Sequence, residues 1–255
     1  MNSSGFEPRF YRSKMGEGRF VPFTIGYKDS DLWIGIDSKS YNTEIQDFAQ
    51  RRLVELRQSL ELYILNHPLF ATSFVPIELL LGAPEIAKIM SIAGLKTGTG
   101  PMAAVAGAFS EFIGKAVQAE FGVEEIVVEN GGDIYLSLKR DLLMSVYAGD
   151  SPLSGKLGVQ IPAHYTPLGV CTSAGTVGPS INFGKADAVM VICKDTALAD
   201  AYATALSNKI KLANDIPIQQ QFYSTEQEII SLLMICQGQI GISGQFEIKP
   251  IKSVG

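Results

Sequence analysis

Thr196-Ala-Leu-Ala-Asp-Ala-Tyr-Ala-Thr-Ala-Leu-Ser-Asn-Lys-Ile210 is the segment whose structure and chemistry are clearest in this sequence. Its composition predicts an apolar helix over 197–210 that carries few polar groups. Two of these groups, Asp200 and Thr204, are four residues apart and therefore lie on one face of the helix. A carboxylate and a hydroxyl are hard oxygen ligands of the kind that Mg²⁺ binds. The alternative is a structural aspartate satisfied by neighbouring amides.

Two segments upstream combine glycines with polar side chains next to predicted strands. In Glu129-Asn-Gly-Gly-Asp133 the paired glycines permit positive φ, and their exposed amides can form an anion site. An Asn-Gly hairpin turn is the alternative for this segment. In Cys171-Thr-Ser-Ala-Gly-Thr-Val-Gly-Pro-Ser180 the hydroxyls and glycine amides suit phosphate oxygens. A polar loop with ordinary turn chemistry is the alternative there.

Lys185 and Asp187 add a cation and an anion where the next predicted strand begins. In an enzyme that acts on a nucleotide pyrophosphate, Lys185 would offset developing negative charge. Asp187 would act as a base or as a further metal ligand. The two histidines of the chain offer no candidate Ser-His triad, so any chemistry would depend on a metal and positioned donors.

Predicted strands and helices alternate along the rest of the chain, which indicates an α/β or α+β fold. A hairpin is expected over 20–36, a helix that follows an N-cap at Thr43 and ends before Asn66, and a second helix from Pro84 that stops at Gly94. Later strands are expected at 125–129, 134–138, 142–148, 157–161, 169–172 and 186–192. A helix is expected at 226–234, and a closing strand pair at 239–242 and 245–248.

A loop rich in glycine and threonine precedes a helix of small residues. The loop, which includes Thr97 and Thr99, runs into Pro101 and predicts a helix start with several unpaired amides. The small residues of the helix imply that another backbone approaches it closely. Residues 106–113 also resemble residues 199–206 in the spacing of their alanines, aromatic and polar groups. A true duplication would give two half-domains that face a shared cleft, and chance similarity of alanine-rich helices is the alternative.

Composition excludes several classes of protein. The 255 residues are 46% hydrophobic and 18% charged, as expected for a globular chain with a large core. A net charge of −5 without a basic face argues against nucleic-acid binding. The sequence contains no apolar run of membrane-spanning length and no secretory pattern, so a cytoplasmic location without membrane association is expected. Cys171, Cys193 and Cys236 lie in apolar segments and are expected to be reduced core thiols.

The order of these segments resembles the ApbE-like (FAD:protein FMN transferase) superfamily. The resemblance covers about residues 94–210 and includes Gly107–Glu111, Gly131–Asp133, Thr172–Gly175 and, most specifically, Ala199–Leu206. It implies a single ApbE-like domain over 1–255, with half-domains at about 15–150 and 151–250 around a cleft. It also implies an FAD-like flavin ligand, Mg²⁺ held by Asp200 and Thr204, and transfer of FMN to a Thr or Ser of a target protein.

The chain departs from the transferases in ways that place it with a shorter, uncharacterised branch. Residues 180–187 contain no histidine where the transferases have a His-Ile-Ile-Asp-Pro-like segment, and Ala106-Gly107 replaces their Lys-Gly. A flavin- or nucleotide-binding protein without turnover is therefore one alternative, and a structural homo-oligomer with a vestigial pocket is another. The expected cofactor-binding residues are Thr97, Thr99, Glu111, Asn130, Gly131, Gly132, Asp133, Thr172, Ser173, Gly175 and Thr176.

Overall fold

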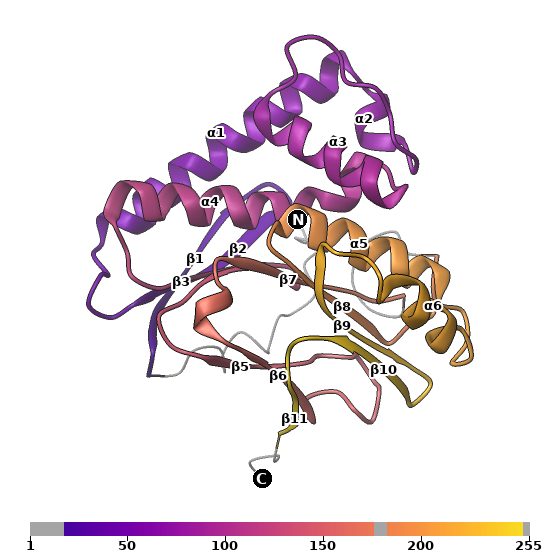
Figure 1. Cartoon of the computed structure of the whole chain (residues 1–255). Helices are drawn as coiled ribbons and strands as arrows, with labels where there is room; N and C mark the ends of the chain where they lie inside the picture. Colours follow the sequence, from indigo (N-terminus) through magenta and orange to yellow (C-terminus); the bar gives the residue numbers. More distant parts are fainter. Residues whose placement is uncertain (1–17, 176–182, 252–255) are drawn as a thin grey trace, which may run out of the picture.

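The fold is built on an eight-stranded antiparallel sheet with helices on one face and a small second sheet on the other (Figure 1). The structure, a computed structural model, describes residues 18–175 and 183–251. The order of the large sheet is β1-β2-β3-β4-β7-β8-β9-β10, and that of the small sheet is β11-β6-β5. This arrangement confirms the α+β class expected from the sequence.

The element bounds follow the chain. The strands are β1 Phe20–Tyr27, β2 Ser30–Asp37, β3 Ile126–Asn130, β4 Asp133–Ser137, β5 Leu142–Ser145, β6 Leu157–Ile161, β7 Leu168–Ser173, β8 Ala188–Cys193, β9 Ile229–Cys236, β10 Gln239–Gly244 and β11 Ile248–Pro250. The α-helices are α1 Glu44–Asn66, α2 Leu69–Thr72, α3 Glu85–Thr97, α4 Val105–Phe121, α5 Thr196–Lys209 and α6 Asp215–Tyr223. A short 3₁₀ turn, Pro101–Ala104, leads into α4.

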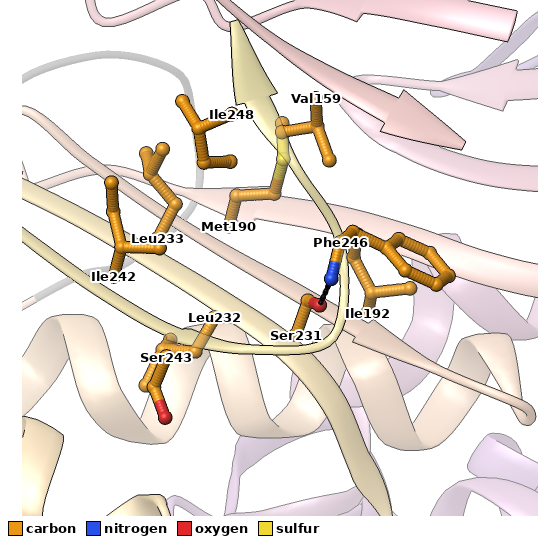
Figure 2. Close-up of a pocket in the computed structure, with 10 residues that line it drawn as sticks. All are labelled: Val159, Met190, Ile192, Ser231, Leu232, Leu233, Ile242, Ser243, Phe246 and Ile248. Atoms are coloured by element: carbon orange, nitrogen blue, oxygen red, sulfur yellow. Dashed lines mark hydrogen bonds between the residues drawn. The ribbon is translucent and has the colours of Figure 1, made fainter. Parts of the chain in front are cut away.

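The large sheet separates two hydrophobic cores. Successive side chains of a strand point to opposite faces, so Val189 and Val191 of β8 pack under the helices while Met190 and Ile192 face the small sheet. Figure 2 shows this second core, where Met190, Ile192 and Phe246 meet side chains from both sheets. The space among them does not admit a water molecule. The region between the sheets is therefore packed core and not a ligand site.

The order of elements in the large sheet repeats. Strands β1 and β2, helices α1 to α4, then β3 and β4 form one four-stranded half, and β7, β8, α5, α6, β9 and β10 form the other. The halves join where β4 pairs with β7. Helices α4 and α5 occupy corresponding places and pack against each other. This repetition is what a duplication predicts, although the proposed half-domain boundaries remain a prediction.

The sequence-based helix at 226–234 is wrong, because β9 occupies Ile229–Cys236. This strand lies between β8 and β10 and is buried on both faces, so it is a continuous apolar run with no alternation to reveal it. The helix of this region is instead α6, which comes earlier in the chain. The expected pairing of 239–242 with 245–248 is also wrong, since β10 pairs with β9 and β11 pairs with β6.

Two helix ends differ from expectation. Helix α3 continues through Gly94 and ends at Thr97, where Gly98 follows as the C-cap with a left-handed φ of 74°. A Cβ on Gly94 would lie 2.8 Å from the carbonyl oxygen of Thr99, so this glycine serves close packing and not termination. Thr43 precedes α1 but makes no side-chain cap, and Asn42 Oδ1 accepts a hydrogen bond from Glu44 N instead.

The three cysteines are free and buried, as expected. Within residues 18–175 and 183–251, none of the helices combines the length and the apolar character needed to cross a bilayer.

A partly buried ion pair ties the start of β1 to the segments beside it. Arg19 donates to both carboxylate oxygens of Glu125, at 3.1 and 2.6 Å. The backbone amides of Lys139 and Arg140 donate to Glu125 Oε1. Burial alone would raise the pKa of Glu125, but these hydrogen bonds outweigh it and lower that pKa. The folded state therefore favours the ionised carboxylate.

Glu125→Gln is expected to lower the free energy of unfolding at pH 7 by about 2–3 kcal/mol, because it leaves Arg19 without its counter-ion. A lowered folded-state pKa contributes stability above the unfolded value, so the difference from wild type should shrink as the pH falls below 4.5. Urea unfolding at several pH values measures both effects. The exposed neighbour Glu124→Gln is the control and should behave as wild type. A constant difference between pH 3 and 7 would contradict the assignment.

Candidate functional site

The candidate site begins where α4 and α5 cross. The backbone amide of Gly107, near the start of α4, donates a hydrogen bond of 2.9 Å to Asp200 Oδ2 on α5. A Cβ on Gly107 would lie 2.4 Å from the carbonyl oxygen of Thr196. Only glycine therefore allows the two backbones to come this close. The close approach that the small residues predicted is present, and it positions Asp200.

Glu111, one turn further along α4, completes this crossing. Its Oε2 accepts a hydrogen bond of 2.6 Å from Thr196 N at the start of α5, and its Oε1 is paired with Lys115 Nζ. Asp195 caps the same helix end by accepting from Leu198 N at 2.7 Å. Both oxygens of Glu111 thus have partners within the protein. The expectation that Glu111 contacts a ligand gains no support, and we infer instead that it fixes α5 against α4.

Asp200 is a buried carboxylate that lacks a cationic partner among the described residues. Its side chain belongs to a residue that is 7% exposed, and the hydrogen bonds it accepts come from the backbone amides of Gly107 and Ala106. Burial raises the pKa of Asp200 to about 7, and the two amides only partly offset that rise. A buried carboxylate in this state favours a cation beside it, since a charge without a partner is costly in a low-dielectric interior.

Thr204 lies one turn after Asp200 on the same face of α5 and is half-buried, whereas most of this helix is fully buried. Its hydroxyl has no hydrogen-bond partner in the described parts of the chain. Asn208, a further turn along, is also half-buried and accepts a hydrogen bond of 2.8 Å from Phe183 N. Residues 200, 204 and 208 thus form one polar stripe. Asn208 was not singled out from the sequence, although its position eight residues after Asp200 places it on the same face of the helix.

The turn between β3 and β4 is docked onto the start of α4. Asn130 and Asp133 pair across a two-residue hairpin turn in which Gly131 and Gly132 have φ of 69° and 103°. Asn130 Nδ2 donates to the carbonyl oxygen of Ala106 at 3.3 Å, and Ser110 Oγ donates to that of Asp133 at 2.8 Å. This turn is the hairpin alternative, with the glycines required by positive φ. Ser110 is a second residue that the sequence did not single out.

One amide of this turn is not available to a ligand. Gly132 N donates to Glu129 Oε1 at 2.8 Å. The carbonyl oxygen of Gly132 accepts from Thr172 N at 3.2 Å, which brings the turn beside the end of β7. The Asn-Gly-Gly-Asp turn and the Thr-Ser-Xaa-Gly segment are therefore neighbours, although about 40 residues separate them in the sequence.

Cys171 connects these segments to Asp200. Its thiol is fully buried and lies 3.4 Å from the carbonyl oxygen of Thr196. Burial, followed by the negative charges of Asp133 and Asp200, raises the pKa of Cys171. Asp133 and Asp200 therefore lie close to the same thiol. The sulfur remains protonated, as expected of a core thiol, and supplies no nucleophile.

The end of β7 carries Thr172 and Ser173, both half-buried. Gly175 follows them, and its amide donates to the carbonyl oxygen of Ala186 at 2.9 Å. A Cβ on Gly175 would lie 2.3 Å from the carbonyl oxygen of Gly184, so this glycine holds the two ends of the loop together. Thr176 lies outside the described residues.

Lys185 and Asp187 lie at the other end of α5. Lys185 N donates to the carbonyl oxygen of Ile210, ten residues after Asp200, which corresponds to about 15 Å along a helix. The side chain of Lys185 is exposed. Asp187 Oδ2 accepts from Gln237 N at 3.0 Å, in the turn between β9 and β10. The structure thus separates Asp187 from Asp200, so the two carboxylates do not form one acid–base pair.

Thr97 and Thr99 turn toward the protein. Their hydroxyls lie 2.8 Å apart, and that of Thr97 also bonds the carbonyl oxygen of Ala93 at 2.9 Å. Thr99 is buried. Their expected contact with a cofactor therefore gains no support from these hydrogen bonds. The described residues also contain no cluster of three or more His, Cys, Asp or Glu side chains that could hold a metal.

The chain is similar to known proteins over most of its length. The family model described as "AbpE bacteria" matches residues 12–228. The UPF0280 protein MJ1526 of Methanocaldococcus jannaschii is 36% identical over 223 residues, which cover 86% of this chain and 88% of that protein. The UPF0280 protein of Methanocella arvoryzae is 46% identical over 158 residues, which cover 62% of this chain and 64% of that protein.

Two solved structures share this fold at low sequence identity. The flavinyl transferase ApbE of Pseudomonas stutzeri, in its apo form, has a TM-score of 0.52 and 14% identity, covering 92% of this chain and 95% of that one. The ApbE protein of Thermotoga maritima has a TM-score of 0.54 and 14% identity, covering 88% of this chain and 97% of that one. At this sequence identity the similarity shows a shared fold and nothing beyond it.

Proposed function

We propose a function for this chain on the premise that it belongs to the AbpE bacteria family within the ApbE-like superfamily. In this proposal the chain binds a flavin dinucleotide together with Mg²⁺ on the polar stripe of α5. It then transfers the FMN group of the dinucleotide to a protein hydroxyl. The observation that carries the proposal is the pairing of Asp200 and Thr204. The first is a buried carboxylate with no described cation beside it, and the second is a half-buried hydroxyl one turn away that has no described hydrogen-bond partner.

The residues present fit a hard divalent cation. Asp200 and Thr204 would supply two of its oxygen ligands, and waters and phosphate oxygens would supply the others. A bound Mg²⁺ would neutralise charge on the pyrophosphate and on the departing AMP. Asp200 is held in place for this role by the Gly107 amide, so its orientation does not depend on the metal.

Other residues would hold the remainder of an extended dinucleotide. Thr172 and Ser173 lie beside the Asn130–Asp133 turn, and in this proposal their hydroxyls would contact phosphate oxygens or the polar edge of the flavin. Lys185, exposed near the far end of α5, would meet a second negative group of the same ligand. Ligand groups spread along one helix in this way suit a long molecule better than a compact one.

The transfer itself would exchange one phosphate linkage for another. The acceptor hydroxyl oxygen of a Thr or Ser in a target protein bonds to the phosphorus of the FMN half, the pyrophosphate P–O bond breaks, and AMP leaves. The hydroxyl proton passes to a base. Because Asp187 bonds to the Gln237 amide and lies apart from Asp200, we propose that it shapes the β9–β10 turn and is not this base.

Titration of the purified protein with FAD, followed by flavin fluorescence, tests the proposal. We expect saturable binding that is at least about tenfold tighter with 5 mM MgCl₂ than with EDTA, because the cation links Asp200 to the phosphates. Incubation of the Mg²⁺–FAD complex with a Thr-containing acceptor peptide should release AMP, measured by chromatography. Absence of binding in both buffers would remove the flavin from the proposal, and equal binding in both would remove the metal.

A flavin carrier without turnover is the second candidate. The separation of Asp187 from Asp200 favours it, since the site then has a metal position without an identified base. Mg²⁺-dependent binding without AMP release would support the carrier over the transferase.

A further inference from the structure

A separate cavity of about 380 Å³ lies between α3, the start of α5 and the start of β9. Leu198 lines it, whereas Asp200 contacts α4. Side chains two positions apart on a helix point in directions that differ by about 200°, so the cavity and the candidate metal position are on opposite sides of α5. Its volume is within the usual range for small-molecule sites. The flavin proposal does not use this cavity.

The walls of the cavity are mostly apolar. Ile89, Ile92 and Ala93 form one stripe of α3, and Leu198 and Ile230 face them from α5 and β9. Ile92 is 55% exposed although it lines a hollow. Binding lowers the free energy when the apolar part of a ligand displaces water from a surface of this kind.

The two lysines at the rim are already engaged. Lys194 Nζ donates to the carbonyl oxygen of Tyr165 and lies 5.9 Å from the centroid of that ring, so its charge points toward another segment. Lys96 forms an ion pair with Glu228 across the mouth. Their side chains are 43% and 41% exposed, and an ion pair this open to water is weak and easily rearranged.

Three carboxylates, Asp195, Glu228 and the neighbouring Glu226, lie at or beside the mouth, where Lys96 is the cation that faces them. Among the described residues Asp195 has no cation within ion-pair distance, and Lys115 and Lys96 act on it only from further away. Glu226 lies close to Glu228, since both carboxylates are within 3.4 Å of the Tyr202 hydroxyl. An anionic ligand would find few donors, because the α5 amides of Thr196 and Leu198 are capped by Glu111 and Asp195. The charge balance therefore favours a cation.

We propose that this cavity binds a small amphipathic amine, with its ammonium between Asp195 and Glu228 and its apolar chain along Ile89, Ile92 and Ile230. The ammonium takes the place that Lys96 holds on Glu228, and Asp195 supplies a second acceptor. The apolar chain sets the size of the ligand, since it must fit between α3 and the start of β9.

The isoleucine methyl signals of the ¹³C-methyl-labelled full chain report binding directly. We expect n-hexylammonium to shift the Ile92 and Ile230 methyls saturably, with a Kd of about 1 mM, as befits seven non-hydrogen atoms. Hexan-1-ol should bind at least about tenfold more weakly, and hexanoate should not shift them. Equal affinity for the three probes, or no shift at 20 mM amine, would overturn the proposal.

Asp195→Asn is the decisive variant, because asparagine caps a helix about as well as aspartate but carries no charge. It should weaken the amine about tenfold and leave hexan-1-ol unchanged. Ile92→Ser should weaken both probes, whereas Leu95→Ser, which is 71% exposed on the same helix and outside the cavity, should weaken neither. Unchanged amine affinity in Asp195→Asn, or equal effects of the two serine variants, would contradict the site.

Discussion

Asp200→Asn is expected to weaken Mg²⁺-dependent FAD binding about 100-fold, or about 2.7 kcal/mol, and to abolish AMP release. The substitution removes one charge at nearly constant volume. The amide oxygen of asparagine can still accept the hydrogen bond from Gly107 N, so α4 and α5 should keep their crossing. The melting temperature should be unchanged or higher, because the variant no longer buries a carboxylate without a cation.

The experiment separates metal binding from folding. FAD titration with MgCl₂ and with EDTA gives the affinity, and calorimetry gives the melting temperature. Thr204→Val should produce a smaller loss of about tenfold, because it removes one neutral ligand of similar shape, and Thr204→Ser should restore most of the affinity. If Asp200→Asn binds Mg²⁺ and FAD as wild type does, Asp200 is a structural residue and the metal position is elsewhere.

Gly107→Ala should cost about 3 kcal/mol of unfolding free energy, although alanine is the better helix former. Its Cβ would lie 2.4 Å from the Thr196 carbonyl oxygen and 2.9 Å from Asp200 Cβ, so the helices must separate. For a chain of this length that corresponds to a fall in melting temperature of about 6–12 °C. The movement also carries Asp200 away from its amide, and Mg²⁺-dependent FAD binding should weaken in parallel.

Gly26→Ala is the matched control for this prediction. The added Cβ would lie 3.4 Å from the carbonyl oxygen of Ser30, which is an ordinary contact. This variant should change the free energy of unfolding by less than about 1 kcal/mol. If chemical denaturation gives Gly107→Ala the same free energy of unfolding as Gly26→Ala, the α4–α5 crossing accommodates an added Cβ and the prediction is wrong.

Elements whose pattern is local were predicted well. The hairpin of β1 and β2 alternates between buried and exposed faces along β1, and the polar residues between the two runs mark its turn. Helix α5 matched within one residue, because its composition and the Pro-free run are those of a helix. The family and the α+β class were also predicted, since the order of short motifs along the chain is a property of the sequence.

The roles of the site residues were predicted less completely. Residue type and spacing identified Asp200 and Thr204 as oxygen donors on one face, and the paired glycines permitted the positive φ that Gly131 and Gly132 adopt. The sequence could not show that Glu111 would accept a hydrogen bond from Thr196 N, or that Asp187 would accept one from Gln237 N. A carboxylate that caps a backbone amide and one that faces a ligand have the same sequence signature.

The sequence by itself therefore determined the local periodicities, the glycines that permit positive φ and the donor types of the candidate site. Tertiary structure alone decided that 229–236 is a strand, because its burial between β8 and β10 on two faces removes the alternation that would reveal it. It alone also decided that Gly107 meets Asp200, 93 residues away. Such contacts depend on how two helices pack on one sheet, and no short-range pattern encodes that distance.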